Sequence, residues 1–401
     1  MSLAASVLSL ALASAFLAGP SLAAPADDRI QKGVSSGLRA AALGSDTTIH
    51  VRHVATDATV ADADGDERQV PASTRKVITA ATSLVSLGED YRFATRVMLG
   101  SEAGRVVLVG GGDPLLSRAD LVSLAQRTAR KLRQAGLTSI VVDVDDYLFP
   151  QPTDAEGWAP GDRPTYAAAV RPLAILGEYS NDTAASALAV FVQELRSKGV
   201  AAQAGARALV PDGARRIAVI RPHTVREAVD IMLKVSENNV AEVLFRQVAL
   251  ARGYPATWSS ASAAATEALR DIGVPSWRLR LVDGSGLSAR NRLTAESLTH
   301  ILDISLGDSR LGALIDGLPV AGRSGTLINR FAAPPASCAR GDVAAKTGSL
   351  TGVSTLAGVT RGSDSQWRSF AIMVNQRPSA YSTSATSLAI DTLAAIVQGC
   401  A

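Results

Sequence analysis

The chain has 401 residues and a mass of 41.4 kDa, which is enough for roughly two or three domains. Apolar residues make up 47% and charged residues 19% of it, so it can bury a sizeable core, and disordered, collagen-like and coiled-coil proteins are excluded. The 40 basic and 37 acidic residues leave a net charge of only +3. No basic block with interleaved aromatic residues is present, so we expect no nucleic-acid partner.

The first 26 residues carry no charged side chain, and residues 3–18 form an apolar run that is too short to span a membrane comfortably. Small residues at 21–23 and 24–26 offer two cleavage points, as in a secretory signal peptide. We therefore predict a leader over residues 1–26 and an exported protein, in the periplasm or cell wall or secreted, with peripheral or no membrane contact. Because a basic start is missing, an uncleaved anchor and a buried helix stay open as alternatives.

The chain has two cysteines, Cys338 and Cys400. In an oxidising compartment these two can pair only with each other. Such a disulfide would stabilise the fold by about 4 kcal/mol through the loop that it closes. Two buried free thiols are the alternative.

The N-terminal part of the chain alternates helix and strand patterns. Apolar spacing predicts a helix over residues 30–43, ended by Gly44. β-branched residues predict two short strands within residues 47–60, broken at Thr56-Asp57. A second helix is predicted over residues 73–87, with one apolar face toward the core.

The chain changes character over residues 95–147, and we predict a separate inserted lobe over residues 97–184. Strand patterns lie at 106–109 and 140–144, and a helical pattern lies at 121–132. Residues 150–172 are rich in Pro, Gly and Asp and are predicted to form a long surface loop.

The remaining residues, 27–96 and 185–401, are predicted to form one discontinuous domain. Its C-terminal part carries three strand patterns and a closing helix, at residues 343–348, 350–360, 367–375 and 384–397. The predicted fold class is α+β, an antiparallel sheet flanked by helices.

The first candidate for chemistry is Ser73-Thr74-Arg75-Lys76 at a predicted helix start. Residues three apart on a helix face the same way, so the ammonium of Lys76 lies beside the hydroxyl of Ser73. A serine beside a lysine that can lose its proton is a nucleophile with its own base. The alternative is a capping serine with a first-turn lysine, which is awkward because that lysine meets the positive end of the helix dipole.

The second candidate is Ser236-Glu237-Asn238, which connects helical patterns at residues 225–235 and 240–250. Side chains two apart point to different sides of a helix, so Ser236 and Asn238 can serve one site only if they lie on a bend. The alternative is a polar loop that caps the second helix.

The third candidate is Lys346-Thr347-Gly348-Ser349 in a strand pattern. A glycine weakens a strand unless something must approach its backbone closely, such as a bound ligand. The alternative is an edge strand that a lysine protects from aggregation.

In this order the three patterns are the signature of penicillin-binding proteins and class A β-lactamases. The stretches around them resemble the D-alanyl-D-alanine carboxypeptidase/endopeptidases of the low-molecular-mass class C penicillin-binding proteins, a family of serine peptidases. The resemblance covers residues 47–398 and rests on PASTRK (71–76), SENNVAE (236–242), DGSGLS (283–288), LPVAG (318–322), GTL (325–327) and AKTGSL (345–350).

The resemblance implies that Ser73 attacks the penultimate D-alanine of a muramyl peptide while neutral Lys76 takes its proton. For this the pKa of Lys76 must fall well below its reference of about 10.4. Ser236 would pass the proton to the leaving amine, and Asn238 would hold the substrate amide and orient Lys76.

The resemblance further implies a binding role for the third pattern. Lys346 and Thr347 would receive the substrate carboxylate, Gly348 would permit its close approach, and the N–H groups of Ser73 and Ser349 would form the oxyanion hole. The implied partners are peptidoglycan muramyl peptides and β-lactams, with no metal and no organic cofactor.

Two departures from the family pattern stand out. Arg75 and Glu237 occupy variable positions where the family more often has an apolar residue and Asp, and neither is expected to do chemistry. Only 159 residues separate Lys76 from Ser236, so one small insertion is expected rather than two.

Other motifs are set aside. Residues 33–37 match G-x-S-x-G but lie in a helical pattern without a preceding strand. The four histidines are scattered, so no metal site is expected. Residues 110–113 form a turn rather than a phosphate loop, and Asp143, Asp145 and Asp146 are expected at a solvated strand end.

Two other functions stay open. A β-lactamase or esterase would use the same nucleophile but needs a fast deacylation device, and no clear glutamate motif for it is present. A non-catalytic exported protein that binds peptidoglycan is the other alternative.

Overall fold

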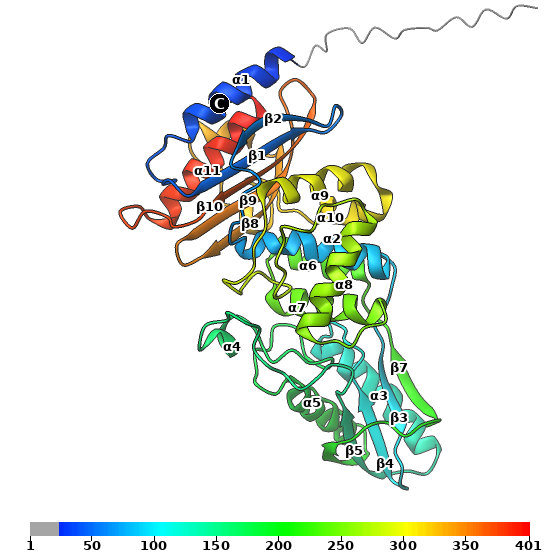
Figure 1. The fold of residues 1–401 in the computed structure, drawn as a ribbon. Coiled ribbons are helices and arrows are strands. Elements are labelled where there is room, and N and C mark those ends of the chain that lie inside the picture. The colour runs from blue at the N-terminus through cyan, green and yellow to red at the C-terminus, as the bar shows by residue number, and fades with distance from the viewer. Residues whose placement is uncertain (1–23) are drawn as a thin grey trace, which may run out of the picture.

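The computed structural model describes residues 24–401 and shows a first lobe built on an antiparallel sheet and a second, smaller lobe (Figure 1). The predicted leader, residues 1–26, lies outside the described residues except for its last three, which begin helix α1 (Ala24–Gly37). The helix expected over residues 30–43 therefore starts and ends earlier. Among residues 24–401 no helix is long and apolar enough to cross a membrane.

The sheet of the first lobe joins strands from both ends of the chain. Its strands are β1 (Thr47–His53), β2 (Ala58–Ala63), β8 (Val343–Leu350), β9 (Val353–Arg361) and β10 (Trp367–Val374). They pair antiparallel in the order β2-β1-β10-β9-β8. The two short strands predicted near the N-terminus and the three predicted near the C-terminus are all present, although β2 extends beyond the predicted residue 60. Strand β8, which carries Lys346, is an edge strand.

The two faces of this sheet are both covered by helices. Helix α1 and the closing helix α11 (Thr383–Gln398) pack on one face, where Leu356 and Ile372 are buried. Alternate residues such as Ala357 and Met373 point to the other face and join a helical core. Every residue of β9 except the last is buried, as expected for a strand covered on both faces.

The helices on the second face surround α2 (Arg75–Leu87), the helix predicted to start at Ser73. They are α6 (Val225–Lys234), α7 (Asn238–Ala251), α8 (Trp258–Asp271), α9 (Ala295–Gly307) and α10 (Gly312–Asp316). Short 3-10 turns complete this lobe: η1 (Ala72–Thr74), η2 (Ser309–Leu311), η3 (Gly325–Leu327) and η4 (Ala336–Ala339). All residues of α2 from Arg75 to Leu84 are buried, so this helix is the centre of the core.

The second lobe has its own sheet and core. Its elements are β3 (Thr95–Leu99), β4 (Arg105–Val109), α3 (Arg118–Gln134), β5 (Ser139–Asp145), α5 (Thr183–Ser197), β6 (Ala201–Arg207) and β7 (Arg216–Ile220). The strand order is β6-β5-β4-β3-β7. Helices α3 and α5 pack against each other and the sheet, with Leu124 and Phe191 fully buried.

The limits of this lobe differ from the predicted 97–184. Strand β3 begins at Thr95, α5 runs across residue 184, and β6 and β7 pair with β5 and β3. The lobe sheet therefore extends to Ile220. Strand β7 returns beside β3 from more than a hundred residues away, a pairing that local sequence patterns do not contain.

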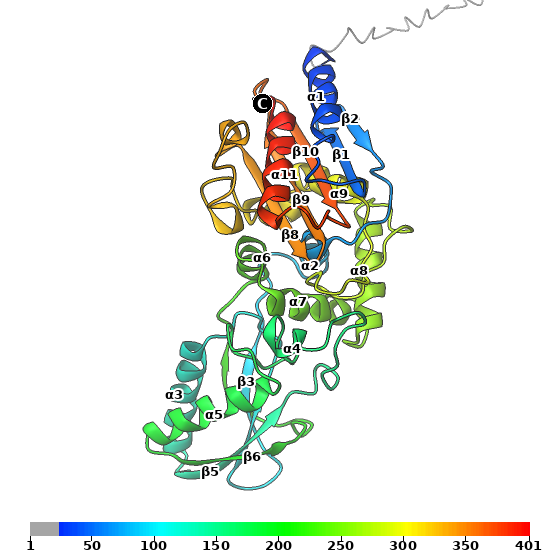
Figure 2. The ribbon, with the colours of Figure 1, turned by 90° about the vertical axis from the view of Figure 1, so that its left-hand side faces the viewer.

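The long segment between β5 and α5 does not stay in the second lobe. It contains the short helix α4 (Asp162–Thr165) and runs beside α7 of the first lobe (Figure 2). Residues 167–170 are buried, so the predicted surface loop is partly an interior segment.

The acidic group at the end of β5 is buried rather than solvated, contrary to expectation. Asp143 accepts hydrogen bonds from Arg105 at 2.9 and 2.5 Å, and Asp146 accepts one from Arg171 at 2.5 Å. Asp145 accepts from the backbone N–H of Val210 at 2.9 Å. We interpret these carboxylates as structural, because each is buried and accepts a hydrogen bond from a neighbouring donor. Among residues 24–401 no group of three or more metal-ligating side chains occurs.

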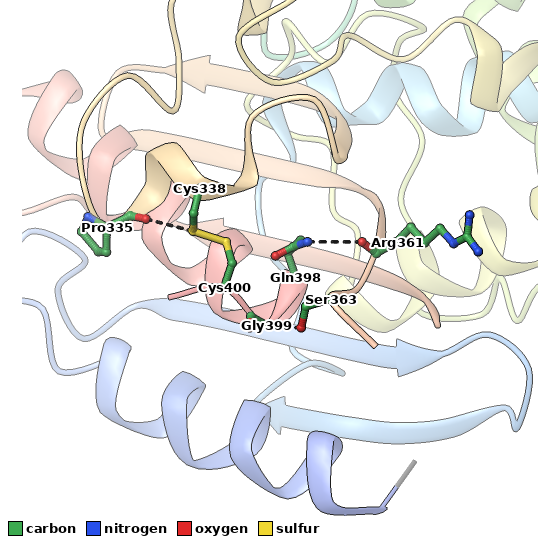
Figure 3. The surroundings of a disulfide bond; sticks show 7 residues. All are labelled: Pro335, Cys338, Arg361, Ser363, Gln398, Gly399 and Cys400. Carbon is green, nitrogen blue, oxygen red and sulfur yellow. Dashed lines mark hydrogen bonds between the residues drawn. A yellow bond between two sulfur atoms is a disulfide. The ribbon is translucent and has the colours of Figure 1, made fainter. Parts of the chain in front are cut away.

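Cys338 and Cys400 form a disulfide that ties turn η4 to the end of α11 (Figure 3). The predicted pairing is confirmed. The G-x-S-x-G match is a packing feature of α1, because a Cβ on Gly33 would lie 2.6 Å from Ile396 of α11.

Candidate active site

Ser73 lies in turn η1, directly before α2, rather than inside the helix itself. Ala72 precedes it with a φ of +46°, a left-handed conformation that costs roughly 1–2 kcal/mol for a residue with a Cβ. Such conformations persist where the surroundings enforce them, often at functional sites. Here the turn exposes Ser73 to a cleft while Ala72 is buried.

Lys76 follows one turn later, and its amine is fully buried. Its Nζ lies 2.9 Å from Ser73 Oγ, as the spacing of the first pattern predicts. It donates to Asn238 Oδ1 at 2.7 Å and to the main-chain oxygen of Ser285 at 2.8 Å. These two oxygens can only accept, so a neutral amine that donates to both keeps its lone pair for the Ser73 hydroxyl.

Burial lowers the pKa of Lys76 to about 8. The carboxylates of Glu242, Asp283 and Glu237 oppose that shift, in this order of size. The neighbouring guanidinium of Arg75 adds to it. Complete burial is thus the main cause of the lowered pKa.

Ser236 and Asn238 lie on a sharp bend, as two side chains that serve one site require. Ser236 has a φ of +63° between α6 and α7, and Asn238 is the first residue of α7. Asn238 Nδ2 donates to the main-chain oxygen of Tyr166 at 2.8 Å. This bond orients the amide so that Oδ1 faces Lys76.

Lys346 completes the arrangement from strand β8. Its buried Nζ donates to Ser236 Oγ at 3.0 Å and to the main-chain oxygen of Thr347 at 2.8 Å. The pKa of Lys346 is held well below its ordinary value by burial and by the nearby charge of Lys76. Hydrogen bonds therefore link the three sequence patterns: the first to the second through Lys76 and Asn238, and the second to the third through Ser236 and Lys346.

The rest of the third pattern lines the site along the edge of the sheet. Thr347 Oγ1 donates to Thr326 Oγ1 at 2.8 Å. A Cβ on Gly348 would lie 2.9 Å from the backbone N of Ser73 and 2.2 Å from Thr355 Oγ1. Glycine is required here because β8 passes directly against η1. Ser349 is exposed in the same cleft as Ser73.

The cleft has a volume of about 420 Å³. Its walls come from turn η1, the start of α7, the loop of residues 286–289, the end of β8 and the long segment between β5 and α5. They include Ser73, Gly157, Asp162, Tyr166, Asn238, Leu287 and Ser349. The inserted part of the chain, for which the sequence suggested no purpose, therefore forms one wall of the candidate active site.

Four contributions were missed at the sequence level. The main-chain oxygens of Tyr166 and Ser285 give no signal in a sequence, because any residue type supplies a carbonyl. Trp158 of the long segment donates from Nε1 to Asp283 at 2.9 Å. Glu242, in the stretch SENNVAE, is fully buried beside the site.

The fold resembles solved penicillin-binding proteins. The structure of penicillin-binding protein 4 from Haemophilus influenzae superposes with a TM-score of 0.78 at 21% identity, over 90% of this chain and 97% of that one. The fold class is thus the predicted one, a penicillin-binding-protein fold with an additional lobe.

Sequence relatives give the family. A carboxypeptidase of Mycolicibacterium smegmatis is 34% identical over 94% of this chain and 86% of its own length. A carboxypeptidase of Mycobacterium tuberculosis is 35% identical over 77% of this chain and 71% of its own length. Residues 30–179 and 174–397 match the D-Ala-D-Ala carboxypeptidase 3 (S13) family, to which the chain belongs. The predicted family and enzyme class are confirmed.

Proposed function

We propose that the protein hydrolyses the D-Ala-D-Ala bond of peptidoglycan stem peptides through an acyl-enzyme on Ser73. The single observation that carries the proposal is the buried Lys76 amine, 2.9 Å from Ser73 Oγ and with a pKa of about 8. An amine of this pKa is neutral in a useful fraction of molecules near neutral pH and can act as a general base.

In the first step Ser73 Oγ attacks the carbonyl carbon of the penultimate D-alanine, and its proton passes to Lys76 Nζ. The C–N bond to the terminal D-alanine then breaks. Ser236 delivers a proton to the leaving amine and receives in turn the proton that Lys76 took from Ser73, so Lys76 returns to its neutral form. Lys346, whose Nζ lies 3.0 Å from Ser236 Oγ, orients this hydroxyl. Free D-alanine leaves, and an ester joins the peptide to Ser73.

The negative charge that develops on the carbonyl oxygen needs two donors. The backbone N–H groups of Ser73 and Ser349 are the proposed oxyanion hole, and the close approach of β8 to η1 at Gly348 supports it. One such donor is typically worth about 2.7–4 kcal/mol in the transition state.

The terminal carboxylate of the substrate is assigned to Lys346 and Thr347. A carboxylate beside Lys346 would favour the charged amine and so raise its pKa again. Asn238 already gives one N–H to Tyr166, and its second N–H remains for the substrate amide. Water then hydrolyses the ester and restores Ser73.

A β-lactam would enter the same cleft and acylate Ser73 by opening its ring. The leaving nitrogen stays attached to the acyl group, so the ester persists and the enzyme is inhibited. Substrates and inhibitors of this kind are met outside the cytoplasm, which fits the predicted export to the periplasm, cell wall or medium.

The experiment is an assay of free D-alanine after incubation of the purified protein with a pentapeptide that ends in D-Ala-D-Ala. We expect release by the wild type and none by Ser73→Ala. A cross-linked muropeptide in a parallel reaction tests endopeptidase activity. No release from either substrate would contradict the proposal and favour a peptidoglycan-binding protein, and rapid turnover of penicillin would favour a β-lactamase.

A further inference from the structure

The main chain of Gly284-Ser285 is held at all four of its polar groups. The N–H groups of Gly284 and Ser285 donate to Glu242 at 2.8 and 2.9 Å, one to each carboxylate oxygen. The oxygen of Gly284 accepts from Thr79 Oγ1 at 2.6 Å, and that of Ser285 accepts from Lys76 Nζ at 2.8 Å. All these atoms are buried, so few alternative partners are available.

Two glycines let this segment lie against its neighbours. A Cβ on Gly284 would be 2.3 Å from the main-chain oxygen of Ala241 in α7. Gly286, with a φ of +84°, lies so close to η1 that a Cβ would be 1.9 Å from the oxygen of Ala72. The segment is thus wedged between the helix that carries Glu242 and the turn that carries Ser73.

Glu242 lies one helical turn after Asn238 on α7, so both side chains share a face. Asn238 contacts Lys76 directly at 2.7 Å. Glu242 contacts it through the Ser285 carbonyl. One helix therefore fixes both acceptors that direct the lone pair of Lys76 toward Ser73.

Opposite charges surround this arrangement. Arg75 is fully buried next to Lys76, donates to Thr79 at 2.9 Å, and lies 5.1 Å from the ring centre of Phe245. Asp283 accepts from the N–H groups of Gly286 and Ser288 at 2.9 and 2.6 Å.

Further charged groups face the same region from α7 itself, from the bend before it and from β8. Arg246 lies on α7, Glu237 lies at the bend before it, and Lys346 lies on β8. The negative charges of Glu242, Asp283 and Glu237 act on Lys76 against the positive charge of Arg75.

We propose that Glu242 is a positioning residue for the general base: its carboxylate clamps Gly284-Ser285 so that the Ser285 carbonyl aims Lys76 at Ser73, while Arg75 balances its charge. This inference rests on the proposed function of Ser73 and Lys76.

Removal of the charge of Glu242 and removal of the charge of Arg75 are predicted to shift the pKa of Lys76 in opposite directions. Burial and the nearby charge of Asp283 raise the pKa of Glu242, whereas the N–H groups of Gly284 and Ser285, one on each carboxylate oxygen, favour its ionised form. Removing that negative charge lowers the pKa of Lys76, and removing the positive charge of Arg75 raises it. Only neutral Lys76 accepts the proton, so the acylation rate rises with pH as Lys76 is deprotonated. The midpoint of this rise, the acid limb of the pH profile, therefore follows the pKa of Lys76.

The experiment measures the rate of acylation by a fluorescent penicillin between pH 5 and 10 in the full-length protein. For Glu242→Gln we expect the acid limb to move down by about one pH unit and the plateau to fall about tenfold, because the amide accepts only one of the two N–H groups. For Arg75→Met the limb moves up. Glu242→Asp keeps the charge, so its limb stays in place while its plateau falls.

Glu227→Gln is the matched control, since Glu227 also accepts two hydrogen bonds, from the N–H and hydroxyl of Thr224 in a helix cap. It should keep the wild-type profile. An unmoved limb in Glu242→Gln and Arg75→Met would overturn the inference, even if rates fall. If Glu242→Gln does not fold, the Arg75→Met variant decides. A shift of its acid limb to higher pH supports the inference, and an unmoved limb or a shift to lower pH overturns it. Failure of the proposed function looks different: the wild type itself is not acylated, or Ser73→Ala still is.

Discussion

At the scale of single residues, the main electrostatic feature is a pair of fully buried amines, Lys76 and Lys346, beside the cleft that contains Ser73. Neither Lys76 nor Lys346 has a carboxylate in hydrogen-bond contact among the described residues. Each therefore keeps a lowered pKa, for which burial is the main cause. Proton transfer to and from serine is easier for such amines than for exposed lysines.

Replacing Lys76 by arginine tests the base. Arginine keeps the positive charge but does not lose its proton at accessible pH, so acylation should fall by about 10²-fold or more. In the wild type, acylation should rise with pH through a midpoint near 8, because the neutral form of Lys76 gains there. Stopped-flow labelling with a fluorescent penicillin measures both.

Lys234→Arg serves as the control for this substitution, because Lys234 pairs with Asp230 at the end of α6 and should keep wild-type rates. A Lys76→Arg variant that acylates at the wild-type rate would exclude Lys76 as the base.

The sequence predicted side chains of the site better than its main-chain groups. Ser73, Lys76, Ser236, Asn238 and Lys346 were all named from motif spacing, and the structure brings them together. Residue type says nothing about a carbonyl, so the acceptors at Tyr166 and Ser285 could not be found this way.

At the scale of elements, the contact of strand β8 with turn η1 sets the position of Ser73. Thr355 of β9 donates to the main-chain oxygen of Pro71 at 2.8 Å and so holds the turn from the next strand. The edge strand therefore both supports η1 and presents the third motif to the cleft.

Gly348→Ala should separate β8 from η1, since the new methyl group meets Thr355 and the backbone N of Ser73. We expect acylation to fall by about tenfold or more, because the N–H groups of Ser73 and Ser349, the proposed oxyanion donors, would lose their alignment. Gly312→Ala, where a Cβ meets nothing within 4 Å, is the control. Equal acylation rates in both variants would show that the close approach is unimportant for catalysis.

The disulfide is a second device at this scale. It closes a loop with a sequence separation of 62 residues, worth about 4 kcal/mol on the loop-entropy estimate. Cys338→Ser combined with Cys400→Ser should lower the free energy of unfolding by roughly that amount in urea titrations. Acylation of the folded variant should be unchanged, because the disulfide lies on one face of the sheet, with α11, whereas α2 and the helices that surround it lie on the other face. A variant as stable as the wild type would contradict this estimate.

Predicted elements matched best where their patterns are local. The strands of the first sheet and helix α11 were placed within a few residues, because their apolar periodicity is regular. The limits of the second lobe were placed less well. Strand β6 (AAQAGAR) has a weak strand pattern, and its pairing with β5 is a contact between distant residues that no local pattern contains.

At the scale of the whole molecule, the two lobes meet along the long segment and α7. Gln247 of α7 donates to the main-chain oxygens of Gly111 and Gly112 at 2.9 and 3.1 Å. The backbone N–H of Ala168 donates to Asn239 at 2.7 Å. The wall of the cleft that contains Tyr166 therefore depends on the second lobe.

Trp158→Phe should weaken this connection, because it removes the hydrogen bond to the buried Asp283. Bonds to charged groups contribute about 1.5–3 kcal/mol, and we expect a loss of that order in the free energy of unfolding. Trp277→Phe, at a side chain that is 79% exposed, should change little. Equal stabilities of the two variants in denaturant titrations would contradict a connecting role for Trp158.

The central claim is that motifs from three distant parts of the chain make Ser73 a nucleophile in one cleft. The most direct measurement is the intact mass of the protein after incubation with penicillin, followed by peptide mapping of the adduct. We predict one added β-lactam per chain, on the peptide that contains Ser73, and none in Ser73→Ala. A wild-type protein of unchanged mass, or an adduct on another peptide, would contradict the account.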